Sequence, residues 1–204
     1  IVGQITGKPL EVIVTHMHPD HAGCIKYFDK VWMHRADTVL VPQHAADYQG
    51  EFLYMEEGQV FDLGGRKLEV AWMPGHTPGS VVLLDKANGD CYSGDAFGSG
   101  EVWLQCVPMS PIATFHESCC RMEKLMKEGH IKDIWCGHYP YLKSSLPLAY
   151  IQTMIRISHR LMNGDQEGSE PYSNYFIKMP PTARKLAEGR AMIVYDSTNI
   201  PEAR

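Results

Sequence analysis

Residues 16–21 read His16-Met17-His18-Pro19-Asp20-His21, and they bring three imidazoles and one carboxylate together within a very short stretch of chain. Core packing does not require such a cluster, whereas imidazole and carboxylate are ligands that suit zinc and similar divalent metals. The cluster follows residues 10–15, an apolar and β-prone run that we expect to form a buried strand. Ligands at the carboxyl end of such a strand lie where α/β folds usually build their sites. The pattern therefore favours a metal site over a solvated, histidine-rich loop.

Three more residues with metal-binding side chains occur where an expected strand turns into a glycine-rich loop. His76 follows a strand expected at 67–73, Asp95 follows one at 90–93, and His138 follows one at 131–136. A single histidine beside glycines is usually a turn residue. Three such residues in addition to the opening cluster are difficult to explain as turns, so they indicate a shared site.

Taken in order, the motifs His-x-His-x-Asp-His, Gly-His-Thr-x-Gly, Ser-Gly-Asp and Gly-His resemble those of the metallo-β-lactamase superfamily of metal-dependent hydrolases. The resemblance covers about residues 8–140. It implies an α/β fold, the αββα sandwich, with two metal ions. The implied ligands are His16, His18 and His76 for one metal and Asp20, His21 and His138 for the other, with Asp95 bridging both. Within this set, Asp20 and Asp95 are the candidate catalytic carboxylates.

The spacing of the first motif agrees with this division of ligands. His16 and His18 are two residues apart, so in extended chain they point to one side and can share a metal. Asp20 and His21 lie beyond the turn that Pro19 forces, and they can face a second metal. The motif is therefore compatible with a dinuclear site.

Two metals in one site indicate hydrolytic chemistry. Divalent ions about 3.5–4 Å apart hold a hydroxide between them and stabilise both ends of a displacement. Because metal-bound water has a pKa of about 7, the nucleophile exists at neutral pH. We therefore expect a bridging hydroxide to attack the carbonyl of a small acyl substrate. Zinc is the expected metal because hydrolysis needs no redox change, and iron or manganese would also fit the ligands.

Departures from other branches of the superfamily narrow the expected substrate. The β-lactam hydrolases carry a cysteine where this chain has Asp95, and they lack a histidine at the position of His21. Flavin-linked diiron oxygen reductases carry a glutamate in place of His18. The form found here is most similar to thioesterases of the glyoxalase II type and to lactonases. The tyrosine that lactonases carry after the bridging aspartate is not found in residues 96–100, and no basic helical tail of the glyoxalase II type is recognised. We therefore expect a thioester, a lactone or a related activated acyl compound as substrate.

Two other functions stay open. The chain could be a non-catalytic metallo-β-lactamase-like module for binding or assembly, or a phosphodiesterase of the same superfamily. Retention of all seven ligand positions favours the hydrolase. The chain begins at Ile1, and the antiparallel strands that usually precede the first motif are missing. We therefore expect an incomplete amino-terminal sheet with uncovered apolar edges, which keeps the module in consideration.

Composition is that of one enzyme domain, which we place at residues 1–204. The net charge is −5, and no basic run resembles a nucleic-acid footprint. No apolar stretch is long enough for a membrane span. The six cysteines have irregular spacing, which favours reduced thiols and a cytoplasmic protein. We expect a small-molecule substrate, neither nucleic acid nor membrane as a partner, and possible homo-oligomers.

Periodicity and turn signals predict the remaining elements. Helices are expected at 21–29, 35–44, 111–129 and 147–162, and strands at 31–34, 60–63 and 190–195, with a hairpin of 80–84 and 90–93 around Asn88-Gly89.

The segment 165–204 has two interpretations. In one, it covers the active site and binds the leaving group or acyl chain of the substrate. In the other, which is favoured, it forms an edge hairpin that packs its aromatic side chains on the core. Its aromatic cluster is Tyr172, Tyr175 and Phe176.

Several single residues have open assignments. Phe97, Trp103 and Gln105 could line a pocket, since they follow Asp95. Cys136 is interpreted as a buried small hydrophobe rather than a ligand. His116 is the one histidine outside the motifs that could approach a site.

Overall fold

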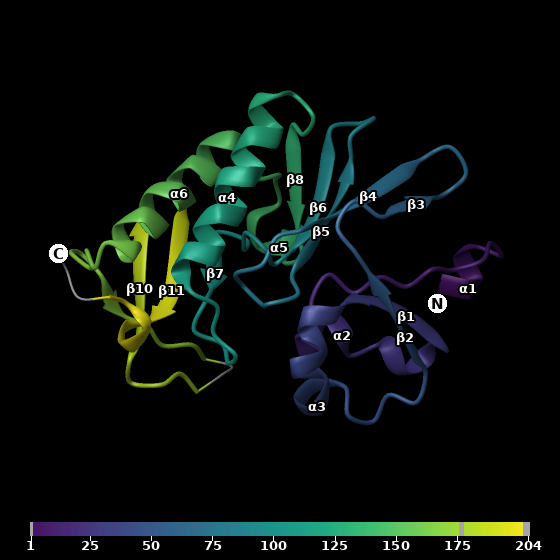
Figure 1. Cartoon of the computed structure of the whole chain (residues 1–204), viewed down its shortest axis with the longest axis horizontal. Coiled ribbons are helices and arrows are strands. Elements are labelled where there is room, and N and C mark those ends of the chain that lie inside the picture. Colours follow the sequence, from purple (N-terminus) through teal and green to yellow (C-terminus); the bar gives the residue numbers. More distant parts are fainter. Residues whose placement is uncertain (1, 176–177, 202–204) are drawn as a thin grey trace.

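The computed structural model describes residues 2–175 and 178–201, whose strands form three sheets (Figure 1). The largest sheet has the order β3 (Val60–Asp62), β4 (Lys67–Trp72), β5 (Val81–Asp85), β6 (Asp90–Gly94) and β8 (Asp133–Cys136). Its pairs are antiparallel except β6 and β8, which are parallel. A second sheet has the order β7 (Glu101–Trp103), β11 (Ala191–Asp196), β10 (Ala183–Glu188) and β9 (Glu170–Pro171). The parallel pair β1 (Lys30–His34) and β2 (Glu51–Met55) forms the third.

Two long helices, α4 (Ile112–Lys127) and α6 (Leu148–Met162), pack against each other. The remaining helical segments are short: α1 (Val2–Ile5), α2 (Pro19–Ala22), α3 (Val41–His44), α5 (Tyr139–Leu142), and the 3-10 turns η1 (Ile25–Tyr27), η2 (Arg35–Leu40) and η3 (Ser197–Asn199). In Figure 1, α2, α3, β1 and β2 form a group that lies apart from α4 and α6.

The largest sheet buries both of its faces. On one face Ala71, Val82 and Leu84 join a core shared with α4, α6 and the sheet of β10 and β11. On the other face Val70 and Val81 pack in a separate cluster. Side chains of successive strand residues alternate between the faces, so the near-continuous apolar run of β5 is explained by burial on both sides. This rigid sheet carries the loops of the site at its edge.

Most expected elements are confirmed with small shifts in their ends, including α4, α6, β1, β3, β4, β8, β11 and the hairpin of β5 and β6. Residues 35–44 are helical, as η2 followed by α3. Gly89 has a φ of 78°, which suits the expected turn between β5 and β6.

Two expectations near the first motif are wrong. Residues 10–15 do not form a strand, because their strand pairing among the described residues is limited to an isolated bridge from Ile13 to Trp32, and Leu10 is exposed. The expected helix at 21–29 is broken into α2 and η1. Gly23, a poor helix former, follows the last residue of α2 and a 3-10 turn replaces the continuation.

Strands β2, β7, β9 and β10 were not expected from the sequence. The sequence of β10, Ala-Arg-Lys-Leu-Ala-Glu, has little intrinsic preference for strand. Its antiparallel pairing with β11 from Ala183 to Glu188 overrides that preference.

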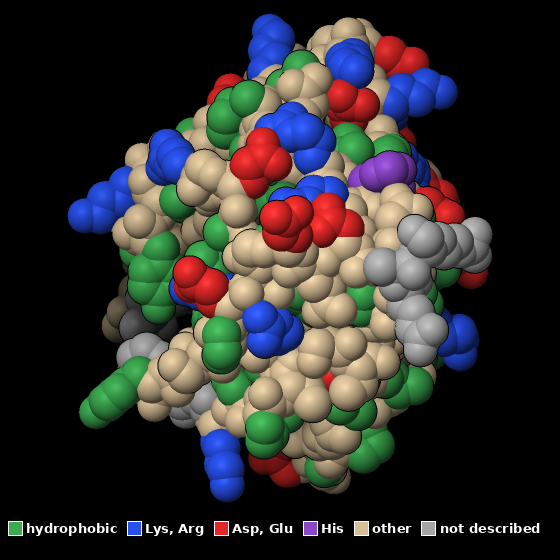
Figure 2. Space-filling view, turned by 90° about the vertical axis from the view of Figure 1, so that its left-hand side faces the viewer, with side chains coloured by type: hydrophobic (Ala, Val, Ile, Leu, Met, Phe, Trp, Pro, Cys, Tyr) green, Lys and Arg blue, Asp and Glu red, His purple; other side chains and the backbone are tan. Residues whose placement is uncertain are grey.

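The surface carries charges of both signs. The face drawn in Figure 2 has Lys and Arg side chains interspersed with Asp and Glu side chains, without a continuous basic area. No helix of the described residues is long and apolar enough to cross a membrane.

Candidate metal centre

The seven predicted ligand positions meet at one edge of the largest sheet. His76 follows β4, Asp95 follows β6 and His138 follows β8. Because β6 and β8 are parallel neighbours, their carboxyl ends deliver Asp95 and His138 to the same place. The backbone N–H of Val81 donates to the carbonyl of Thr15, which fixes the start of the 16–21 motif beside this sheet.

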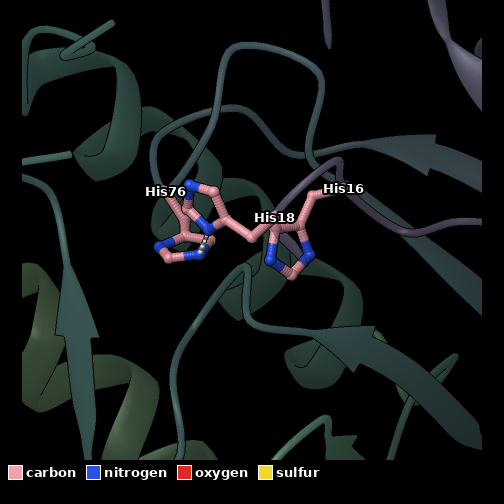
Figure 3. Close-up of side chains that lie close together, drawn as sticks. All are labelled: His16, His18 and His76. Atoms are coloured by element: carbon pink, nitrogen blue, oxygen red, sulfur yellow. Dashed lines mark hydrogen bonds between the residues drawn. The ribbon is translucent and has the colours of Figure 1, made fainter. Parts of the chain in front are cut away.

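Three histidines form the first group: His16, His18 and His76 (Figure 3). The Nδ1 atom of His18 lies 3.0 Å from the Nε2 atom of His76. The ring centroid of His16 is 4.9 Å from that of His18 and 4.8 Å from that of His76. His16 and His76 are buried, and His18 is half-buried. The three rings converge from two segments that lie about 60 residues apart in the sequence, and they could hold one metal ion.

The second group contains Asp20, His21, Asp95 and His138. The Nε2 atom of His138 lies 3.0 Å from Oδ2 of Asp95 and 3.3 Å from Oδ2 of Asp20. The Nε2 atom of His21 lies 3.4 Å from the same oxygen of Asp95. Asp95 Oδ2 is also 4.0 Å from the Nε2 atom of His76, so this carboxylate lies between the two groups.

Two buried polar atoms of the cluster fit a metal better than they fit the protein alone. Within the described residues, Nε2 of His16 and Oδ1 of Asp95 have no hydrogen-bond partner. A buried polar atom without a partner costs about 1–3 kcal/mol. Because one is an imidazole nitrogen and the other a carboxylate oxygen, a divalent metal would satisfy both. The donor set therefore fits the metals that the resemblance implies.

His76 is oriented by the backbone. Its Nδ1 atom lies 2.8 Å from the carbonyl oxygen of Trp103, which accepts a hydrogen bond from it. This bond places the proton on Nδ1 and leaves the Nε2 lone pair directed at the cluster. Such a hydrogen bond from the second ring nitrogen is the usual support of a metal-binding histidine.

Burial keeps the three imidazoles of the first group neutral, whereas the hydrogen bond with Asp95 raises the pKa of His138 in the second group. Burial lowers the pKa of His16 well below its usual value, and it lowers the pKa of His76. Burial, with His76 and His44 nearby, lowers the pKa of His18 to about 3. Burial alone would raise the pKa of Asp95, but hydrogen bonds from His138 and His21 hold that pKa well below its ordinary value. Neutral histidines and an ionised carboxylate are the protonation states that metal binding requires.

Asp37, on η2, connects the two loops that carry the first group, and nothing in the sequence pointed to it. Its buried carboxylate accepts hydrogen bonds from the backbone N–H groups of Met17, at 2.9 Å, and Gly79, at 2.6 Å. It also accepts one from the hydroxyl of Thr77, at 3.0 Å. Burial raises the pKa of Asp37, although these bonds oppose the shift. The residue lies in a segment expected to be helical, where a polar side chain is ordinary.

Gly137 lies between β8 and His138, and its missing side chain lets Asp95 and His21 of the second group lie close to the backbone. A Cβ atom at this position would lie 2.6 Å from Oδ1 of Asp95 and 2.6 Å from Cε1 of His21. Both distances are shorter than a Cβ atom tolerates, so a side chain here would displace one of the two residues.

We expect Gly137→Ala to lower the metal content of the purified protein by about one ion per chain, because it disturbs the geometry of the second group. Gly7→Ala is the matched control, since a Cβ atom at Gly7 meets nothing within 4 Å. Inductively coupled plasma mass spectrometry measures both variants. Equal metal content in Gly137→Ala and in the unmodified protein would contradict this assignment.

A cavity of about 1050 Å³ opens beside the cluster. His18, Asp20, His76, Asp95 and His138 line one end of it. The rest of the wall comes from the segment after Asp95 (98–103, Cys106 and Val107), from the turn between β10 and β11 (Ala187 and 189–192), and from the separate positions Pro19, Gln43, His44, Tyr141 and Asn174. This volume is close to the upper limit of about 1,000 Å³ that is usual for small-molecule binding sites.

The structure shows which of the residues with open assignments line the cavity and which do not. Trp103 lines the cavity, whereas Phe97 is buried in the core and Gln105 is not among the lining residues. Cys136 lies in the same hydrophobic core. His116 does not approach the cluster, because its Nδ1 atom is 2.9 Å from the hydroxyl of Ser158 on α6.

The segment 165–204 contains a hairpin, as favoured, and parts of it also reach the cavity. Strands β10 and β11 form a hairpin, and Tyr195 is buried in the core. The turn of the same hairpin lines the cavity, together with Asn174. The ring of Tyr172 contacts that of Trp103, and Tyr175 is exposed. Phe176 lies outside the described residues.

Comparisons with known proteins agree with the motifs. A family model described as the metallo-beta-lactamase superfamily matches residues 7–116. The acyl-coenzyme A thioesterase MBLAC2 of Homo sapiens is 28% identical over 159 residues, which cover 65% of this chain and 57% of that protein. The hydroxyacylglutathione hydrolase of Rhodopseudomonas palustris (strain BisB5) is 28% identical over 149 residues, 70% of this chain and 52% of that protein. The chain thus spans about half the length of these curated relatives.

A solved structure shares the fold. The protein TTHA1623, crystallised in a di-iron-bound form, is 27% identical and superimposes with a TM-score of 0.56. The match covers 72% of this chain and 77% of that chain. The expected α/β class and the metallo-β-lactamase-like fold are therefore confirmed.

Proposed function

The chain belongs to the metallo-β-lactamase superfamily, and from this membership we propose that it is a dinuclear metal-dependent hydrolase of thioesters or related activated acyl compounds. The observation that carries the proposal is the pair of ligand groups with Asp95 between them, at the end of a cavity. The curated relatives support the choice of substrate, because acyl-coenzyme A and hydroxyacylglutathione are both thioesters.

In this proposal His16, His18 and His76 hold one metal, Asp20, His21 and His138 hold the other, and Asp95 contributes to both. When bound, divalent metals supply Lewis-acid activation of water and of the substrate carbonyl, for which zinc is the first choice and iron or manganese the alternatives. The carbonyl of Trp103 keeps His76 in the required tautomer. Asp95 supplies negative charge that offsets part of the charge of two cations.

Residues of the cavity wall form the proposed binding site for the substrate. Asp20 is the most exposed of the proposed ligands, with 56% of its side chain accessible, and it lies at the boundary between the cluster and the cavity. The remaining wall includes Trp103, Val107 and Met192, which offer an apolar surface to an acyl group. This surface excludes water from one side of the reacting carbonyl.

The test is turnover by the intact protein after metal removal and reloading. We expect a chelator to abolish the hydrolysis of acyl-coenzyme A or acylglutathione thioesters, and zinc, iron or manganese to restore it, because no described residue replaces the metals' role. Lactones, phosphodiesters and β-lactams complete the panel. Turnover of phosphodiesters alone would replace the proposal by a phosphodiesterase, and turnover of nothing would favour a binding module.

A further inference from the structure

The turn between β10 and β11 brings a positive charge to the proposed active-site cavity. Glu188 pairs with Ala191, so Gly189 and Arg190 form the tip of the hairpin. Gly189 has a φ of 60°, which a tight turn requires and glycine adopts readily. Arg190 is exposed and lines the cavity.

Pairing with β7 fixes where this tip lies. Strand β11 runs parallel to β7, with Met192 opposite Glu101. The tip is therefore held beside residues 98–100, the loop that follows Asp95. The carbonyl oxygen of Arg190 is 3.6 Å from the position that a Cβ atom on Gly100 would occupy. Two strands of one sheet thus hold the backbone of Arg190 beside Gly100, in the loop that follows Asp95, the proposed metal bridge.

Arg190 has no counter-ion in the part of the chain that the structure describes. Glu188, the nearest acidic residue in the sequence, already forms an ion pair with Arg156 at 2.5 Å. No ion pair or side-chain hydrogen bond of Arg190 occurs within residues 2–175 and 178–201. The charge is therefore available to a ligand.

The acidic residues of the cavity have other roles. Asp20 and Asp95 belong to the proposed metal group. Glu101 accepts hydrogen bonds from Tyr172 and from the indole of Trp103, each at 3.0 Å. Among the described residues, Arg190 is the only Lys or Arg side chain that lines this cavity.

Arg190, at the tip of the hairpin, lies between two cavities. Arg190 also lines a second cavity of about 370 Å³, which lies against the start of α6. A group bound at Arg190 is therefore not confined to the metal end of the main cavity.

We propose that Arg190 binds an anionic group, a carboxylate or a phosphate, on the thiol part of the substrate. The proposal rests on the function proposed above, in which the apolar wall takes the acyl part. A guanidinium matches both anions, because its planar fork donates two parallel hydrogen bonds to either. Arg190 would then set specificity by favouring substrates whose leaving group is charged.

The test measures binding of thioether analogues, which the protein cannot hydrolyse. The probes share a hexyl chain: S-hexylglutathione carries carboxylates, S-hexyl-coenzyme A carries phosphates, and S-hexyl-N-acetylcysteamine is neutral. Calorimetry compares the metal-loaded intact protein with Arg190→Gln and Arg190→Lys. The matched control is Lys132→Gln, which removes the same charge next to the turn between β5 and β6, where Lys132 contacts Gly89 rather than the cluster.

We expect Arg190→Gln to weaken binding of an anionic analogue about tenfold and to leave binding of the neutral analogue unchanged, since a charge-assisted hydrogen bond at an exposed site contributes on this scale. Arg190→Lys should weaken it less, because the charge is kept. The analogue that loses affinity identifies the anion as carboxylate or phosphate.

Unchanged binding of both anionic analogues in Arg190→Gln would overturn the proposal. Equal weakening of the neutral analogue, or failure of the unmodified protein to bind either anionic analogue, would overturn it as well. Because binding is measured without turnover, a protein that binds through Arg190 but hydrolyses no thioester would refute the proposed function and leave this assignment standing.

Discussion

Replacing Asp95 by alanine is expected to lower turnover of the metal-loaded protein by about 10³-fold or more and to remove one of the two metals. Asp95 lies between the ligand groups: its Oδ2 atom is 3.0 Å from Nε2 of His138 and 4.0 Å from Nε2 of His76. Its loss would leave His138 and His21 without their shared carboxylate. Metal stabilisation is worth several kcal/mol, and 1.36 kcal/mol corresponds to a tenfold change in rate. Steady-state kinetics and metal analysis of the same preparation measure both effects.

Asp90→Ala is the matched control for this variant. Asp90 begins the strand that Asp95 follows, and its carboxylate accepts a hydrogen bond from the indole of Trp135 at 2.8 Å, at the far end of β6. Its removal costs this hydrogen bond and an ion pair with Arg66 but touches neither ligand group, so we expect metal content to be retained. Full activity of Asp95→Ala would contradict the role proposed for this carboxylate.

Replacing Asp37 by alanine is expected to reduce both stability and metal affinity, although Asp37 is not a ligand. The variant leaves the buried N–H groups of Met17 and Gly79 without their acceptor. Each unsatisfied group costs about 1–3 kcal/mol, so the free energy of unfolding should fall by several kcal/mol. Because both loops of the first group lose their common support, metal affinity should fall by about 10–100-fold. Chemical denaturation of the metal-free protein and metal titration separate the two effects.

Asp47→Ala serves as control, since Asp47 is exposed and its carboxylate makes no hydrogen bond or ion pair within the described residues. Asp37→Asn should lie between the alanine variant and the unmodified protein, because the amide keeps one acceptor oxygen and brings an N–H₂ group towards donors. If Asp37→Ala binds metal as tightly as Asp47→Ala, the connection between the two loops does not matter for the site.

The convergence of the seven candidate ligand positions could be anticipated because their motifs are local. Each candidate follows a strand or belongs to the 16–21 motif, and the parallel pairing of β6 with β8 brings Asp95 and His138 together. Asp37 could not be predicted, since its role depends on Met17 and Gly79, which reach it only in the folded chain. Sequence patterns describe what a residue can bind, but not which distant backbone groups surround it.

The wrong predictions of secondary structure also arise from contacts between distant parts of the chain. Residues 10–15 have the composition of a buried strand, yet they form only one bridge, because pairing partners rather than composition decide strand formation. Strand β10 is the reverse case, in which β11 stabilises a sequence with weak strand preference. Helices α4 and α6 were predicted well, since their apolar periodicity is read within a single segment.

The proposed dinuclear site is tested most directly by the number of metal ions bound per chain. Metal analysis of the intact protein, purified without chelators and supplied with zinc, should give two ions per chain. His16→Ala should reduce this number to about one, because the Nε2 atom of His16 has no hydrogen-bond partner among the described residues and is therefore free to bind a metal. A content below one ion per chain in the unmodified protein would contradict the account.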